Sequence, residues 1–135
     1  MAKIALTNPL VSIAGVDLSA WVSNLTLDTK YDVIETTTFG SVAKSRVAGL
    51  QDNSVQIDFI QDFAVSAVEA TIYPLLGTTQ TVIVKPVNTT TTATNPTYTF
   101  LALISDRTPL KGAVGQLSTV TISWPISGAI TKASA

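Results

Sequence analysis

The sequence predicts a mainly β protein, a β-sandwich or partly closed β-barrel with one flanking α-helix and a long extended loop. Thr, Val and Ile, which favour strands, are abundant. Pro and Gly recur at intervals that leave segments of ordinary strand length, and one segment alone has a clear helical period. The 135 residues fit a single domain, residues 1–135, of sufficient size to bury a core.

The first third of the chain predicts two strands and a long connection. Residues 10–14 indicate a short strand, and residues 17–21 a single helical turn with Asp17 as its N-cap. Apolar and polar residues alternate through residues 24–34, which is typical of one half-buried antiparallel strand. Residues 35–49 follow no steady period and predict a long loop or an open hairpin.

The middle of the chain predicts a strand followed by the helix. Residues 54–60 alternate again, with Val55, Ile57 and Phe59 on one side. Residues 66–76 form the helix candidate, because Ser66 and Glu69 have the spacing of a capping box and apolar residues follow at helical intervals.

The last third of the chain predicts three more strands. They are residues 81–87, 97–104 and 117–124, and Pro125 is expected to end the last one. Residues 88–97 are polar and repetitive, which favours a solvated hairpin tip. The residues that follow Pro125 predict no more than a short edge segment. The side chains expected to face inward are Tyr98, Phe100, Ala102, Ile104, Val120, Ile122 and Trp124.

The composition argues against an enzyme and against a metal or cofactor site. The chain has no His and no Cys, so the commonest general base, the commonest metal ligand and any thiol chemistry are missing. Lys44 beside Ser45 is a chance-level candidate dyad, and Asp58 with Asp62 is best explained as solvated charge. We therefore expect no catalytic residue, no metal ligand and no cofactor.

Charge and hydropathy narrow the choice of partners. The eight basic residues are scattered, so no basic face for specific nucleic-acid binding is expected. No apolar run has the length of a membrane span, and the first residues do not form a convincing signal peptide. The sequence therefore predicts a chain that stays in the cytoplasm where it is made until it is assembled.

A low charge content favours self-association. Charged residues make up 13% of the chain, against about 25% in a typical soluble domain. Phe39, Val42 and Val47 lie in the long connection outside any strand period. These apolar side chains are either covered by another molecule or folded back on their own sheet.

The order of these features resembles the tail tube proteins of long-tailed bacteriophages. The resemblance covers about residues 10–130 and is most specific at Thr-Thr-Phe-Gly (37–40) and Ala-Gly-Leu-Gln-Asp (48–52), followed by a strand and a helix. It implies six-membered rings that stack into a tube of a virion tail, contacts with other tail proteins, and DNA that passes without specific binding. The loop residues implied to contact other subunits are Thr38, Phe39, Gly40, Val42, Lys44, Arg46, Val47 and Gly49.

A tube that conducts DNA benefits from a wall without basic side chains, because phosphates adhere to Lys and Arg. The polar sides of residues 24–34 and 54–60 supply candidates, which could equally face the outside of the particle. The lumen candidates are Thr26, Asp28, Lys30, Asp32, Gln56 and Asp58. Two other functions stay open: a capsid decoration or other minor virion protein, and a monomeric ligand-binding β-sandwich.

Overall fold

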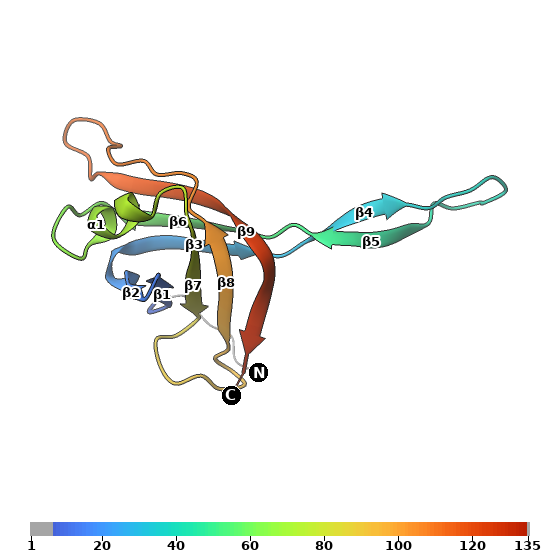
Figure 1. Cartoon of the computed structure of the whole chain (residues 1–135), viewed down its shortest axis with the longest axis horizontal. Helices are drawn as coiled ribbons and strands as arrows, with labels where there is room; N and C mark the ends of the chain where they lie inside the picture. Colours follow the sequence, from blue (N-terminus) through green and yellow to red (C-terminus); the bar gives the residue numbers. More distant parts are fainter. Residues whose placement is uncertain (1–6, 135) are drawn as a thin grey trace.

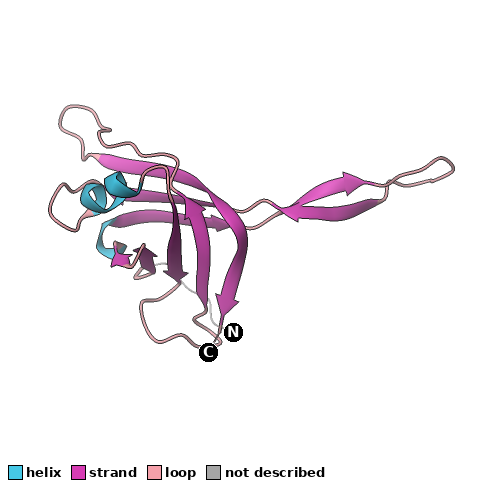
Figure 2. Ribbon diagram, in the orientation of Figure 1, coloured by secondary structure: helices cyan, strands magenta, loops and turns pink. Residues whose placement is uncertain are grey.

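A curled sheet of seven antiparallel strands forms the body of the molecule, and a separate two-stranded arm projects from it (Figure 1; Figure 2). The strand order in the sheet is β2-β1-β7-β8-β9-β6-β3. The predicted fold class, a partly closed β structure with a short helix, is confirmed. The strands of the body are β1 (Leu10–Ile13), β2 (Val16–Asp17), β3 (Val22–Asp28), β6 (Ser54–Ile60), β7 (Thr79–Lys85), β8 (Thr97–Leu103) and β9 (Thr119–Ala133), and those of the arm are β4 (Tyr31–Glu35) and β5 (Arg46–Gln51).

The computed structural model describes residues 7–134. The prediction that the first residues do not form a signal peptide concerns mainly residues 1–6, which lie outside the described part.

The core lies inside the curl of the sheet, where alternate side chains of each strand point inward. Val55, Ile57 and Phe59 of β6 are buried, as the alternation predicted, and Trp124 is fully buried at the centre of β9. The indole Nε1 of Trp124 donates a hydrogen bond of 2.8 Å to the Asp106 carbonyl, which satisfies its one polar atom. The predicted inward positions are confirmed for Phe100 and Ala102 in β8, for Ile104 directly after it, and for Val120, Ile122 and Trp124 in β9, while Tyr98 is half-buried.

Strand β9 corrects the prediction that the last strand ends at Pro125. It runs through the proline to Ala133, pairing with β6 up to Pro125 and with β8 from Ile126 onward. Ile126 N–H donates to the Asn53 carbonyl at 3.0 Å, so the nitrogen of Pro125 points away from β6. The missing N–H of the proline therefore removes no bond of the β6 ladder, and the strand continues.

The single strand predicted over residues 24–34 is wrong. The alternation is real, but β3 ends at Asp28 and β4 begins at Tyr31 in a different sheet. Leu25 and Leu27 pack against the core, whereas Tyr31 and Val33 are exposed on the arm. A period of two marks a strand but not the sheet to which it belongs.

The helical segment is shorter than predicted and has no capping box. It consists of α1 (Val68–Ile72) followed by one 3₁₀ turn, Tyr73–Leu75, which contains Pro74. The N-cap is Ala67, and Ser66 has a φ of 62°, so the serine cannot cap the helix. The Glu69 carboxylate pairs with the Arg107 guanidinium.

Two other local predictions need correction. The single turn is the 3₁₀ segment Ser19–Trp21 with Leu18 at its N-cap, although an Asp17 carboxylate oxygen does accept a bond from Ser19 N–H at 2.9 Å. The polar segment after β7 is a connection between strands, as predicted, but it is not simply solvated. Its Asn95 is buried and bonds Val87 through both its side-chain oxygen and its side-chain nitrogen.

Candidate assembly surfaces

The arm, residues 30–52, is a twisted hairpin held by its own hydrogen bonds. Val33 faces Ala48, Ile34 faces Val47, and the oppositely charged Glu35 and Arg46 face each other. Gly49 allows a close approach, because a Cβ there would lie 3.1 Å from Ile34 Cδ1 and 3.3 Å from Asp32 Cβ and would force these neighbours to shift. The predicted open hairpin is therefore the form that residues 35–49 adopt.

The arm tip, residues 36–45, is closed by side chains at its neck. Thr36 Oγ1 and Ser45 Oγ are 2.8 Å apart, and Ser45 N–H donates to Thr37 Oγ1 at 2.9 Å. Gly40 turns the chain with a φ of 86°. Beyond this neck, Phe39 and Val42 are fully exposed. Of the loop residues implied by the resemblance, five lie in the tip and three lie in β5: the five are Thr38, Phe39, Gly40, Val42 and Lys44, and the three are Arg46, Val47 and Gly49.

Apolar side chains extend from the tip down both faces of the arm. Tyr31 and Val33 occupy one face of β4, and Ile34 occupies the other, all at least half exposed. Leu50 of β5 is 82% exposed. A two-stranded hairpin is marginally stable in water, so an arm with apolar residues on two faces is built for contact with something else.

A chain of side-chain hydrogen bonds anchors the root of the arm in the body. Asn53 is buried, and its Nδ2 donates to the Gly128 carbonyl and to Gln51 Oε1, both at 3.1 Å. Gln51 Nε2 in turn donates to the Tyr31 hydroxyl at 2.8 Å. The amides of Asn53 and Gln51 thus connect the bend of β9 to both strands of the arm.

A polar face covers the outside of the sheet over β3 and β6, and four of the six lumen candidates share it. Thr26 pairs with Gln56, Asn24 pairs with Asp58, and Asp28 follows two residues after Thr26 on the same side. Asn24 Nδ2 donates to Asp58 Oδ2 at 3.3 Å. The other two candidates do not lie there: Lys30 is in the connection after β3 and Asp32 is in β4.

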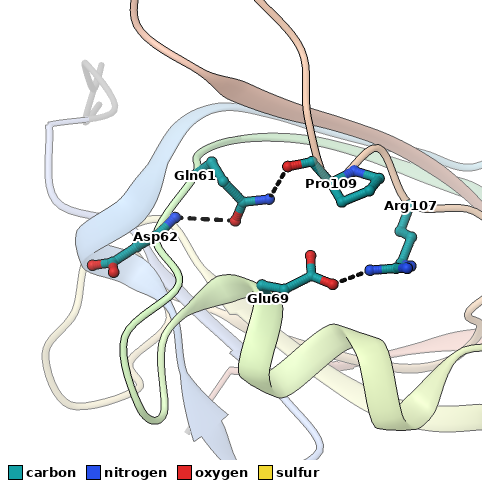
Figure 3. A network of polar contacts seen from close by, with 5 residues as sticks. All are labelled: Gln61, Asp62, Glu69, Arg107 and Pro109. Carbon is teal, nitrogen blue, oxygen red and sulfur yellow. Dashed lines mark hydrogen bonds and ion pairs between the residues drawn. The ribbon is translucent and has the colours of Figure 1, made fainter.

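The end of the body opposite the arm is organised by the polar network of Figure 3. The Arg107 guanidinium pairs with the Glu69 carboxylate and lies 4.5 Å from the centroid of the Tyr73 ring. Gln61 Nε2 donates to the Pro109 carbonyl at 2.7 Å, and Gln61 N–H donates to the Ser118 carbonyl at 3.0 Å. These bonds fasten residues 61–67 and α1 to the long connection between β8 and β9.

Asp62 belongs to the same end. Hydrogen bonds from Ala64 N–H and then from the Trp21 indole lower the pKa of its carboxyl group, and burial opposes this only weakly. The carboxylate is therefore charged at neutral pH.

Five exposed apolar residues lie in the two connections at this end, and sequence reasoning missed them. Each lies in a segment without strand or helix periodicity, for which the sequence predicts only a connection. We call this group the apolar end. Its members are Phe63, Val65, Leu110, Val114 and Leu117, with exposed fractions from 61% to 104%.

Residues 7–134 contain neither a candidate membrane helix nor a candidate metal site. No helix in this range has the length and hydropathy needed to cross a bilayer. Within the same range, no group of three or more Asp or Glu residues is placed to hold a metal ion.

Comparison with known proteins gives a fold but no family. No family model and no curated protein matches the sequence. Among solved structures, a chain from the virion of a native gene transfer agent (GTA) particle superposes with a TM-score of 0.75 at 10% identity, covering 96% of this chain and 98% of that chain. A chain in the six-fold symmetrised structure of the anti-feeding prophage (AFP) baseplate gives a TM-score of 0.59 at 14% identity, covering 98% and 97%. Both therefore share the fold along nearly their whole length.

Proposed function

We propose that this chain is a structural subunit of a phage-like particle that assembles into stacked six-membered rings and forms the tail tube. The single observation that carries the proposal is the arm, which exposes apolar residues on both faces. An isolated domain gains nothing from such a hairpin, whereas a subunit buries it against its neighbours. Other tail proteins are the further partners, and the virion is the final location.

The two structural neighbours support this proposal. One is a chain of a virion particle, and the other is a chain of a baseplate whose structure is six-fold symmetrised. The outer edge of β3 supports ring formation, because β6 is the only strand partner of β3 among residues 7–134. A free edge seven residues long offers a row of backbone groups for a strand of a neighbouring subunit.

The polar face supports a role as the wall of the lumen. Its charged side chains on β3 and β6 are the acidic Asp28 and Asp58, and the strands contribute neither Lys nor Arg to it. The part of this surface on β3 and β6 repels phosphate rather than retaining it, and Lys111 lies at its border with β9, where its Nζ donates to Thr121 Oγ1 at 3.3 Å. In this proposal DNA passes along the polar face without specific binding. Lys30 and Asp32 belong to the arm and not to the polar face.

Electron microscopy of the purified protein with Phe39→Asp as the test variant decides the proposal. The wild type should form rings and tubes, whereas the variant should stop at unstacked particles. Burying an unpaired carboxylate costs several kcal/mol, and the cost recurs at every subunit. Because Phe39 is fully exposed, the thermal unfolding of the variant monomer should match that of the wild type.

Full-length tubes from the Phe39→Asp protein would contradict the role of the arm, and a wild type that stays monomeric at all concentrations would contradict the proposed function. Trimers that bind empty capsids would point to a decoration protein.

A second experiment tests the polar face. In assembled particles, Asp28→Lys together with Gln56→Lys should slow or block DNA ejection and leave the tube intact. The matched control is the double variant Lys30→Asp/Asp32→Lys. It exchanges two charges outside the polar face and leaves the net charge of the protein unchanged. Equal ejection by all three proteins would mean that the polar face does not line the lumen.

A further inference from the structure

The arm continues the ladder of β3 and β6 without a change of register. Asp28 pairs with Ser54 where the body ends, and Tyr31 pairs with Gln51 where the arm begins (Figure 1). Between these pairs both strands advance by three residues, from 28 to 31 and from 54 to 51. Backbone pairing therefore holds the two strands of the arm together. It does not by itself fix the direction in which the pair leaves the sheet, because two-stranded ribbons twist strongly.

The strands are interrupted where the arm meets the body. Residues 29–30 and 52–53 have no strand geometry, and we call them the hinge. Three of these residues are exposed, and a backbone bond of 2.7 Å from Asp52 N–H to the Lys30 carbonyl joins the two sides. The fourth, Asn53, is 1% exposed. The hinge therefore has a single buried side chain.

The body does not pack against the arm. Every residue of β4, and every residue of β5 except Gly49, is exposed, so no side chain of the body covers these strands. A hollow of about 540 Å³ lies beside the hinge, and its lining residues are Leu27, Asp28, Thr29, Gln51, Tyr98 and Ile130. Open space next to an interruption of both strands leaves room for the arm to swing as a unit.

The Asn53 amide joins the hinge to the body. Its Nδ2 donates to the Gly128 carbonyl at 3.1 Å, in the half of β9 that no longer pairs with β6. The Asn53 backbone carbonyl accepts from Ile126 N–H at 3.0 Å, so the side chain adds one further bond to the ladder between β6 and β9. A side-chain amide carries the same kind of donor as a peptide group. Asn53 thus replaces the strand residue that is missing where the chain turns into the arm.

We propose that Asn53 sets the direction of the arm: its side-chain amide holds the hinge against β9, and without this contact the arm swings at the hinge. Asn53 Oδ1 has no hydrogen-bond partner among residues 7–134, so the Nδ2 donor carries the contact. A direction that is fixed in advance reduces the entropy lost when the exposed apolar residues of the arm meet a partner. This is a property of the monomer and does not rest on the proposed function.

Two spin labels, one on the arm and one on the body, measure the direction, since the chain has no Cys of its own. Ala48 in β5 and Ser123 in β9 are both exposed, so Ala48→Cys/Ser123→Cys can be labelled without disturbing the core. Double electron–electron resonance on the monomer should give one narrow distribution of distances. Asn53→Leu keeps the size of the side chain but removes its donor, and should broaden the distribution about twofold or more as the arm swings.

Further variants separate the donor from the shape of the side chain. Asn53→Asp also keeps the size but presents an oxygen to the Gly128 carbonyl, so it should broaden the distribution as Asn53→Leu does. The matched control is Asn24→Leu, at an exposed position of β3, which should leave the distribution narrow. A second label pair, Thr81→Cys/Ser123→Cys, lies wholly within the body and should keep its width in every variant.

Three results would overturn the proposal. A narrow distribution in both Asn53 variants would mean that the backbone alone fixes the direction of the arm. A distribution as broad in the wild type as in the variants would mean that the amide holds nothing. Equal broadening of the label pair within the body would show a loosened fold rather than a swinging arm. Each result is obtained on the monomer, so the proposed function stands or fails separately, by the formation of tubes.

Discussion

The body and the arm are made from the same kinds of residue, yet they use these residues in opposite ways. In β6 every second side chain is buried, whereas in β4 all five residues are exposed. Ile57 of β6 is 1% exposed and Ile34 of β4 is 51% exposed. The body is stabilised within the chain, and the arm keeps its apolar area for contacts outside it. Hydrophobic content therefore identifies the strands but not the core.

The largest effect expected within this comparison is at the centre of the body. Trp124→Ala should lower the free energy of unfolding by about 3–5 kcal/mol, because it removes the largest fully buried side chain and leaves the Asp106 carbonyl unpaired. Urea denaturation of the monomer measures it. Trp124→Phe, which keeps most of the ring, should cost clearly less. A loss below about 1 kcal/mol in the alanine variant would mean that the body is not the stable unit.

One substitution made in both regions sharpens the contrast. Ile57→Thr should cost about 2–4 kcal/mol, since it buries a hydroxyl and opens space in the core. Ile34→Thr should change the stability of the monomer by less than about 0.5 kcal/mol, because the side chain is already half in water. The two variants serve as each other's control in thermal unfolding. Equal losses would show that the arm folds as part of the body.

Replacing Asn53 should affect both the body and the arm. Asn53→Ala removes the donor to Gly128 and to Gln51, and should cost about 1–3 kcal/mol. Amide exchange in β4 and β5 should accelerate more than exchange in β6, because the root of the arm loses its anchor. Asn24→Ala, at an exposed position of β3, is the control and should leave exchange in the arm unchanged. A uniform acceleration throughout the protein would contradict a local role.

The smallest expected effect is on the stability of the fold at acidic pH. Because the folded-state pKa of Asp62 is below its unfolded value of about 3.9, the carboxylate stabilises the fold above that value. This contribution is lost as the pH falls through the lowered folded-state pKa. Asp62→Asn should therefore melt below the wild type at pH 7, and the two melting temperatures should converge in acid. Asp28→Asn is the control, and a gap that persists at the lowest pH would contradict the assignment.

The sequence predicted most of the body, because there a single rule decides each position. Alternating residues such as Val55, Ile57 and Phe59 pack on one side, so period and burial agree. The prediction was wrong where long-range contacts overrule local pattern. Ala67 rather than Ser66 is at the N-cap of α1 and Glu69 pairs with Arg107, and Pro125 stays within a strand because its nitrogen faces away from β6.

The candidate surfaces could be predicted only in part. Phe39 and Val42 stood out from any period, and the structure places both in an exposed tip. Four lumen candidates share a face, but Lys30 and Asp32 were separated from them because no local signal marks where a chain leaves its sheet. Leu110 and Val114 gave no signal either, since two connections distant in sequence form the apolar end.

The double pairing of β9 has a consequence for how the chain folds. Among residues 7–134, β9 alone joins the two halves of the sheet, β3 with β6 and β7 with β8, because Pro125 pairs with Ser54 and Ile126 pairs with Ala102. Pairing across such sequence separations is slow, on the order of milliseconds to seconds, whereas a hairpin such as the arm closes in about 1–10 microseconds. The arm can thus form on a nascent chain whose body is still in two parts. Strand β9 acts as the last closure, and until it closes, the unpaired edges of β6 and β8 are the point at which the chain is most exposed to aggregation.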